Sequence, residues 1–159
     1  MMNLNAGTAA QRSKQSRLAL DRQLCFALYS TSLAMTKLYR PLLEPLGITY
    51  PQYLAMLVLW ESDDLTLSQL GDRLMLDSGT LTPLLKRLEA GGLLQRERDP
   101  GDERRIRITL TPRGRALRRR ANAVPGLAAS ATGCELAELD GLTESLRRLR
   151  ASITAHAAP

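Results

Sequence analysis

Residues 66–110 read TLSQLGDRLMLDSGTLTPLLKRLEAGGLLQRERDPGDERRIRITL, and this stretch sets the architecture of the chain. Apolar residues recur at helical spacing over 66–74 and again over 81–90, which predicts two short amphipathic helices. Asp77 or Ser78 can cap the second helix, and a pair of glycines follows its last residue. Two short helices with about four residues between them predict a helix-turn-helix.

Two short runs of alternating apolar and polar residues come directly after the second helix. LLQRER at 93–98 and RRIRITL at 104–110 flank the turn signal DPGD, and this order predicts a β-hairpin. A helix-turn-helix followed by a hairpin is a winged helix. We therefore expect a winged helix-turn-helix over residues 51–111.

Helices are also predicted on the N-terminal side of the two short helices. Apolar spacing starts a helix near Ser16, and Pro41, which disfavours a helical residue before it, ends this helix one residue earlier. A largely apolar helix begins at Pro51 and ends at Glu61. Residues 1–15 have no apolar period, so we expect a flexible arm.

Two further helices are predicted on the C-terminal side. Thr111 caps a helix that continues to the Pro-Gly pair at 125–126. The final helix covers residues 135–154 and carries a narrow apolar seam of the kind that packs between helices. The seam consists of Leu136, Leu139, Leu142, Leu146, Leu149 and Ile153.

The flanking segments, 16–50 and 112–159, have no place inside a compact winged unit. We expect them to pair with the same helices of a second chain and form a symmetric homodimer. The predicted fold class is therefore mainly α (α+β). It is a winged helix-turn-helix with flanking N- and C-terminal dimerisation helices, in a single domain over residues 16–159.

The charge of the chain is concentrated in one segment. The 159 residues carry 22 Lys and Arg against 16 Asp and Glu, a formal net charge of +6. Residues 96–120 alone hold ten arginines against four acids, an excess equal to that of the whole chain. This segregation favours a polyanion as partner.

Several classes of protein are disfavoured by the composition. Arg12, Lys14 and Arg17 interrupt the only candidate leader, and no charge-free run is long enough to span a membrane, so we expect a cytoplasmic protein with no membrane partner. Two cysteines and one histidine cannot form a four-ligand zinc site. There is no Cys-x-x-Cys and no glycine-rich cofactor loop, so we expect no metal, no cofactor and no enzymatic activity.

The second short helix carries residues that suit contacts with DNA. In a helix-turn-helix the N-terminal residues of this helix face base edges in the major groove. Ser78, Thr80 and Thr82 are short hydrogen-bonding side chains that allow a close approach. Lys86 and Arg87 are long cations suited to phosphate oxygens. We therefore expect these five residues to bind double-stranded DNA.

Acids are interspersed among the arginines of the predicted wing. Asp102 can hold Arg104 in one orientation and present its guanidinium to a narrow A·T-rich minor groove, with Arg105 beside it. Arginine runs are also common on solvated surfaces, but this one coincides with the predicted wing. A symmetric dimer would read an A/T-rich palindromic operator.

Cys25 is the first of two cysteines, and tyrosines follow it on one helical face. Tyr29 is four residues on and Tyr39 fourteen, which puts Tyr39 about 21 Å away along a straight helix. Cys25 and Tyr39 can share a site only if Tyr39 comes from an antiparallel partner helix, and Tyr50 can join from that partner. Hydroxyl groups would stabilise a reactive thiolate there. The alternative is a structural cysteine that only packs.

Three runs of the sequence resemble one known group of regulators. They are QLCFALYSTSLAMTKLYRPLLEPLGITYPQYLAMLVLWE at 23–61, LDSGTLTPLLKRLEAGGL at 76–93 and DERRIRITLTPRG at 102–114. Together they look like the organic hydroperoxide-sensing repressors (OhrR) of the MarR family of winged-helix regulators. The wing motif is typical of MarR proteins in general, whereas the LCF, ITYPQY and LDSGTLTPLLKRLE stretches are narrower.

The resemblance implies roles for several residues. Cys25 would be the peroxidatic cysteine, hydrogen-bonded across the dimer by Tyr39 and Tyr50, with Tyr29 nearby. Some relatives complete the oxidation with a second cysteine near the last helices of the other subunit, a place that Cys134 could fill, and others with a small thiol. Ser130, about one turn earlier, could equally occupy the usual resolving position, and Cys134 would then be a helix-start residue that never meets Cys25.

The resemblance implies a DNA-binding transcriptional repressor that releases its operator when organic hydroperoxide oxidises Cys25. The alternative keeps the fold and changes the trigger. It is a MarR-type regulator released by a non-covalent small aromatic ligand, with Cys25 structural. A thiol peroxidase or reductase is disfavoured, because the sequence has no βαβ pattern.

Overall fold

The computed structural model describes residues 17–157. By its internal contacts the chain divides into residues up to 37 and residues from 38 onward. The first unit holds the short 3-10 turn η1 (Leu20–Arg22) and the first part of helix α2 (Leu24–Leu43). The arm expected at 1–15 lies outside the described residues.

The first helix differs from the prediction at both ends. Over residues 17–23 the structure has η1 instead of the helix expected from Ser16, and α2 starts at Leu24. Helix α2 also continues through Pro41 to Leu43. Pro41 lacks one backbone N–H, but it lies in the last turn, so the loss of a single hydrogen bond does not end the helix.

A short 3-10 turn and the most buried helix follow. The turn η2 (Glu44–Leu46) ends at Gly47, whose φ of 70° is left-handed. Helix α3 (Tyr50–Glu61) begins with a capping box, in which the Thr49 hydroxyl accepts from the Gln52 N–H and the Gln52 side chain accepts from the Thr49 N–H. This cap fixes where α3 begins.

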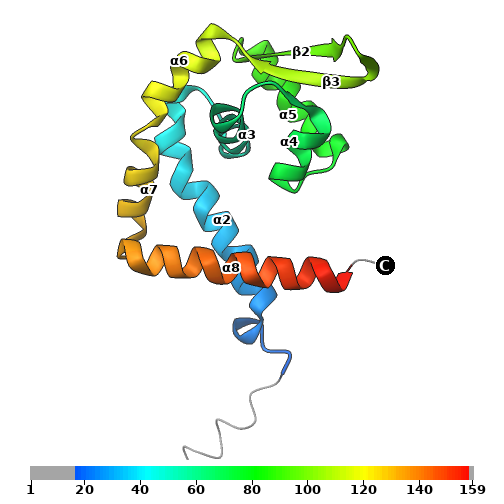
Figure 1. Cartoon of the computed structure of the whole chain (residues 1–159). Helices are drawn as coiled ribbons and strands as arrows, with labels where there is room; N and C mark the ends of the chain where they lie inside the picture. Colours follow the sequence, from blue (N-terminus) through cyan, green and yellow to red (C-terminus); the bar gives the residue numbers. More distant parts are fainter. Residues whose placement is uncertain (1–16, 158–159) are drawn as a thin grey trace, which may run out of the picture. The chain divides into compact units, whose positions relative to one another are not determined.

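The predicted helix-turn-helix and hairpin are confirmed (Figure 1). The helices are α4 (Leu67–Leu74) and α5 (Ser78–Ala90), and the hairpin strands are β2 (Leu94–Asp99) and β3 (Asp102–Leu110). A short strand, β1 (Leu65–Thr66), was not predicted. It pairs antiparallel with β3, so the sheet order is β1-β3-β2.

The C-terminal helices are α6 (Pro112–Ala121), α7 (Val124–Thr132) and α8 (Leu136–Ala157). The predicted single helix up to Pro125 is wrong. Helix α6 ends at Ala121, and Pro125 lies in the first turn of α7, where its missing N–H has no intrahelical partner to lose. Over residues 17–157, no helix is long and apolar enough to cross a membrane.

One apolar core lies in the residues from 38 onward. It joins α3 to the helix-turn-helix, the sheet and α6. The Trp60 indole is buried in it and donates to the Gly114 carbonyl at 2.9 Å, which ties α3 to α6. The most buried side chains are Leu43, Tyr53, Met56, Leu59, Leu70, Leu81, Leu85, Leu88, Leu94 and Ile108.

Candidate functional site

The N-terminal turn of α5 is exposed and held by its cap. The Asp77 carboxylate accepts from the Thr80 N–H at 2.8 Å and from the Thr80 hydroxyl at 3.3 Å. These hydrogen bonds lower the pKa of Asp77 below its usual value, so the cap is ionised at neutral pH. Ser78 and Thr80 are exposed beside the cap.

The remaining predicted α5 residues follow along the helix. Thr82 is half-buried, whereas Lys86 and Arg87 are exposed. Lys86 and Arg87 carry no ion pair within the described residues. Both cations are therefore available to an outside anion.

The tip of the wing carries the ion pair that the sequence predicts between Asp102 and Arg104. The Arg104 Nε lies 3.1 Å from Asp102 Oδ1, and the Arg104 N–H donates to the same oxygen at 3.2 Å. Arg105 Nε lies 3.5 Å from Asp102 Oδ2. These contacts lower the pKa of Asp102. The Arg104 side chain remains 91% exposed, so it is oriented at its base and open to a partner.

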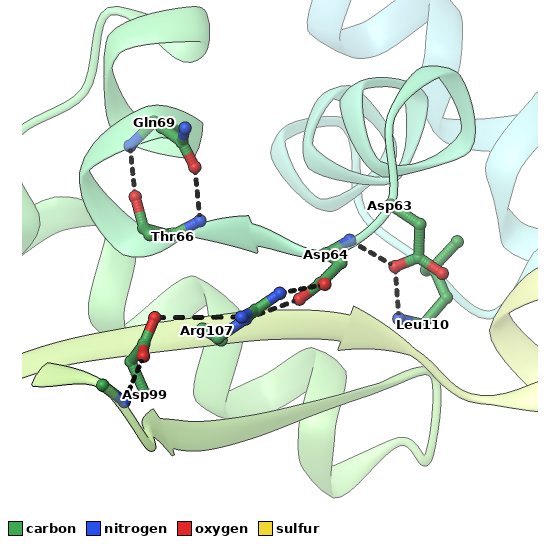
Figure 2. A network of polar contacts seen from close by, with 8 residues as sticks. Asp63, Asp64, Thr66, Gln69, Asp99, Arg107 and Leu110 are labelled. Carbon is green, nitrogen blue, oxygen red and sulfur yellow. Dashed lines mark hydrogen bonds and ion pairs between the residues drawn. The ribbon is translucent and has the colours of Figure 1, made fainter. Parts of the chain in front are cut away.

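An ion-pair network joins the base of the wing to the turn before β1 (Figure 2). Arg107 Nε donates to Asp64 Oδ1 at 2.8 Å, a second guanidinium nitrogen contacts Asp64 Oδ2, and Arg107 Nη1 lies 3.8 Å from Asp99 Oδ2. Asp63 accepts from the Leu110 N–H at 2.8 Å and from Arg115 at 3.1 Å. The network fixes the hairpin against the body of the winged unit.

Sequence reasoning missed this network. Asp64 precedes its partner Arg107 by 43 residues, and Asp63 precedes its partner Arg115 by 52, so neither periodicity nor local spacing pairs them. The one available signal was the presence of acids among the wing arginines.

A cavity of about 390 Å³ lies between the start of α4 and the wing. Arg104 and Arg105 supply positive charge on one side, and the N-terminal turn of α4 supplies backbone N–H groups on the other. The cavity therefore suits an anionic group. Its lining residues are Thr66, Leu67, Ser68, Gln69, Arg104, Arg105 and Ile106.

Two residues of the predicted thiol site, Cys25 and Tyr29, lie on the first part of α2. Cys25 is exposed and has a free thiol. Tyr29, one helical turn further on, is 64% exposed. Both side chains are therefore open to a partner or an oxidant.

Tyr39 and Tyr50 are brought together in the second unit. Their rings are stacked with centroids 4.7 Å apart, and the Tyr39 ring also lies 5.7 Å from that of Tyr53. Burial raises the pKa of Tyr39 and of Tyr50 above the ordinary value of 10.0. Both hydroxyls consequently keep their protons at neutral pH and can donate hydrogen bonds.

Cys134 lies between α7 and α8. It is half-buried and has a free thiol, and its backbone N–H donates to the Thr132 hydroxyl at 3.2 Å. Gly133 before it has a left-handed φ of 69°, which ends α7 and turns the chain. Cys134 thus belongs to a connection instead of a regular helix.

Comparisons with known proteins decide the family. A model described as the MarR family matches residues 48–106, which include the whole helix-turn-helix. The organic hydroperoxide resistance transcriptional regulator of Bacillus subtilis is 53% identical over 114 residues, which cover 72% of this chain and 78% of that protein. The chain belongs to the MarR family. It is therefore a MarR-type transcriptional regulator, and the resemblance to OhrR proteins is confirmed.

Two further relatives of this MarR protein extend the comparison. The regulator TtmR of Methylorubrum extorquens is 45% identical over 148 residues, 93% of this chain and 76% of that protein. Reduced AbfR bound to DNA, a Staphylococcus epidermidis protein, is 38% identical with a TM-score of 0.78, covering 91% of this chain and 99% of the other. AbfR in a disulfide form is similar with a TM-score of 0.59, 37% identity and coverage of 91% and 97%.

The MarR fold thus places the expected residues in separate groups. One lies on α5 and the wing, one on the first part of α2, and one is the stacked pair Tyr39 and Tyr50. Within residues 17–157, no cluster of His, Cys, Asp or Glu could hold a metal ion.

Proposed function

We propose that this MarR protein is a homodimeric DNA-binding repressor that senses organic hydroperoxides through Cys25. In the reduced state it binds an A/T-rich palindromic operator, and oxidation of Cys25 releases the operator. The observation that carries this proposal is the 53% identity with the Bacillus subtilis regulator of organic hydroperoxide resistance. The exposed Cys25 thiol and the exposed Arg104 at the wing tip support it.

The DNA interface consists of α5 and the wing. Ser78, Thr80 and Thr82 approach base edges in the major groove, since their short side chains lie at the start of α5. Lys86 and Arg87 contact phosphates along the same helix. At the wing, Arg104 and Arg105 make a second group of contacts, and Asp102 positions them.

At the wing, Asp102 acts as a positioning residue. It holds the base of Arg104 while the guanidinium enters a narrow minor groove, whose negative potential favours a cation. Arg105 contacts the neighbouring phosphate. Because Asp102 accepts from the arginine instead of from DNA, it orients the contact and makes none itself.

The dimer forms through the helices that flank the winged unit. On α8 the apolar seam is open to solvent in one chain, with Leu136 69%, Leu142 50% and Ile153 55% exposed. Burying such a seam against a second copy gives a large apolar gain. The two α5 helices would then lie about 34–36 Å apart, one turn of the duplex.

The sensing step is stoichiometric thiol chemistry. The Cys25 thiolate attacks the terminal oxygen of an organic hydroperoxide, the O–O bond breaks, and the alkoxide leaves and takes a proton from solvent to become the alcohol. Sulfur is thereby oxidised to the sulfenic acid while the peroxide is reduced. Tyr39 and Tyr50 of the opposite chain, with Tyr29 nearby, donate hydrogen bonds that stabilise the thiolate.

A second thiol completes the oxidation. The Cys134 thiolate of the other subunit attacks the sulfur of the Cys25 sulfenic acid, the S–O bond breaks as the disulfide forms, and hydroxide leaves and takes a proton from solvent to become water. A small thiol can take the same role. Either product changes the helices around Cys25 and therefore the spacing of the two winged units, so groove and phosphate contacts are lost together.

The sensing proposal is tested by measuring how the Cys25→Ser variant binds the operator. Binding to DNA from upstream of the protein's own gene is measured by fluorescence anisotropy. We expect this variant to bind as tightly as the reduced wild type and to ignore cumene hydroperoxide. Cys134→Ser, the matched control, should still react with the peroxide at Cys25. Release of the Cys25→Ser variant by peroxide would overturn the assignment, and release by a small aromatic ligand would favour the non-covalent alternative.

The DNA interface is tested independently of the thiol. Arg104→Gln should weaken operator binding about tenfold or more and relax the preference for A·T at the wing position. Arg150→Gln, an exposed arginine on α8, removes the same charge elsewhere. Equal weakening by both substitutions would mean that only net charge matters and would contradict a specific wing contact.

A further inference from the structure

The hydroxyl of Thr80, in the first turn of α5, has its proton engaged within the chain. The Thr80 Oγ1 lies 3.3 Å from Asp77 Oδ2, while the Thr80 N–H donates to Asp77 Oδ1 at 2.8 Å. These hydrogen bonds lower the pKa of Asp77, so its carboxylate is ionised at neutral pH and can only accept. The hydroxyl therefore donates its single proton to Asp77, and its oxygen can only accept from any other group.

The glycine between these two residues leaves room for the carboxylate. A Cβ at Gly79 would lie 3.1 Å from Asp77 Oδ1, so a side chain at this position would press on the carboxylate. Asp77, Gly79 and Thr80 are all exposed. The direction of the Thr80 hydroxyl is therefore set by its hydrogen bond to Asp77 and not by burial.

The other two hydroxyl residues that we expect to face DNA differ from Thr80. Over residues 17–157, the side chains of Ser78 and Thr82 make no hydrogen bond, so each hydroxyl can donate or accept. Of these three residues, Thr80 alone has a hydrogen-bonding polarity that the rest of the described chain sets.

An oxygen that can only accept does not pair with phosphate. Phosphate oxygens at neutral pH have no proton to donate, and the ionised Asp77 beside Thr80 repels them. On the base edges of the major groove, the donors are the N6 amino group of adenine and the N4 amino group of cytosine. Guanine N7 and O6 and thymine O4 are acceptors, which would face the Thr80 oxygen with no proton between the two. The Thr80 oxygen thus suits an amino group.

We propose that Asp77 is a positioning residue that makes Thr80 specific for a base with an exocyclic amino group. The Thr80 oxygen accepts from adenine N6 or cytosine N4 and disfavours thymine and guanine at the same operator position. In an A/T-rich operator the base is adenine. This assignment rests on the proposed function, because it requires the start of α5 to lie in the major groove.

The test removes amino groups from the DNA one at a time. In duplexes from upstream of the protein's own gene, each adenine is replaced by unsubstituted purine and each cytosine by 2-pyrimidinone, and binding of the reduced protein is measured by fluorescence anisotropy. Thr80→Val, which keeps the shape of threonine and loses the hydroxyl, is the matched reference, because weaker base pairing affects both proteins alike. We expect one replacement in each half-site to weaken wild-type binding roughly threefold to tenfold more than it weakens binding of Thr80→Val.

The Asp77→Asn variant tests whether Asp77 does more than cap α5. Asn is as good an N-cap as Asp, so its Oδ1 can still accept from the Thr80 N–H. The amide Nδ2 then takes the place of Oδ2 and donates to the Thr80 oxygen, which leaves the hydroxyl proton free to donate to DNA. We expect the preferred base to change from adenine or cytosine to thymine or guanine, by roughly threefold to tenfold. Thr80→Ser keeps the hydroxyl and should keep the wild-type preference.

Two results would overturn the proposal. One is the absence of any amino group whose removal weakens the wild type more than Thr80→Val. The other is an unchanged base preference in Asp77→Asn that thermal unfolding shows to be folded, since Asp77 would then be a helix cap only. If Asp77→Asn does not fold, the comparison with Thr80→Val decides alone. Wild-type protein that does not bind this DNA at all would instead contradict the proposed function itself.

Discussion

Arg107 of β3 and Asp64 of the turn before β1 form a two-point ion pair, with Arg107 Nε 2.8 Å from Asp64 Oδ1. Asp64 adopts a left-handed φ of 63°, which aims its carboxylate at the wing. The pair therefore connects the orientation of the hairpin to the body of the winged unit. The wing that carries Arg104 is thus held by a contact to a residue outside the hairpin.

The Asp64→Asn variant tests whether this ion pair orients the wing. Asn accepts the left-handed backbone and keeps the size of the side chain, so only the charge is lost. We expect faster hydrogen exchange at the β1–β3 amides and operator binding weaker by roughly threefold to tenfold. Unchanged exchange in β3 would show that the pair does not hold the wing.

Gly114→Ala should destabilise the protein strongly. A Cβ at Gly114 would lie 1.9 Å from the Leu93 carbonyl oxygen, and backbone cannot move aside there without shifting the start of α6. We expect a loss of more than about 3 kcal/mol in urea unfolding. Gly126→Ala, with no atom within 4 Å of the new Cβ, should instead gain about 0.5–1 kcal/mol. Similar midpoints for the two variants would contradict the close packing at Gly114.

Glu89 should make stability depend on pH. The Arg96 side chain donates to it through Nε at 2.9 Å and Nη2 at 2.7 Å, which lowers the pKa of Glu89 below its ordinary value of 4.5. A carboxyl whose pKa is lower in the folded state than in the unfolded state stabilises the fold at pH values above its unfolded-state pKa. This stabilisation is lost as the pH falls through the folded-state pKa. Wild-type stability should therefore fall below about pH 4.5.

Glu89→Gln tests that dependence. The variant should lose about 1 kcal/mol or less at neutral pH and show a shallower decline in acid, measured by urea unfolding at several pH values. Glu97→Gln, an exposed acid on β2, is the matched control. A Glu89→Gln profile parallel to wild type would mean that the Arg96 contact does not contribute.

Tyr39→Phe and Tyr50→Phe should slow the oxidation of Cys25 by cumene hydroperoxide about tenfold each, because each removes a proposed hydrogen bond to the thiolate. Stopped-flow rates with the reduced protein measure this. Tyr53→Phe, which removes a hydroxyl from a ring in the same cluster, is the control and should not change the rate. An equal effect of all three would point to packing instead of thiolate stabilisation.

The winged unit could be predicted because its signals are local. Thr66 and Asp77 cap α4 and α5, and the DPGD turn closes the hairpin. The residues that set each boundary therefore lie within a few positions of that boundary in the sequence. The Asp102–Arg104 pair was predictable for the same reason, since the two residues are two positions apart. Local chemistry also identified Thr111 as the cap of α6.

The features that were missed depend on distant parts of the chain. Strand β1 is two residues long and exists because β3 is there to pair with it. Arg107 and its partner Asp64 come from segments far apart in the sequence. Pro41 and Pro125 were wrongly predicted to end helices. Pro41 lies in the last turn of α2, where a single hydrogen bond is lost, and Pro125 lies in the first turn of α7, where the N–H has no intrahelical partner.

A reversible thiol switch on operator binding is tested most directly by one measurement. The reduced wild-type protein is bound to labelled DNA from upstream of its own gene, one equivalent of cumene hydroperoxide is added, and dithiothreitol follows. We expect tight binding by the reduced protein, release after the peroxide, and recovery of binding after dithiothreitol in the same sample. Binding that persists through the peroxide step would contradict it.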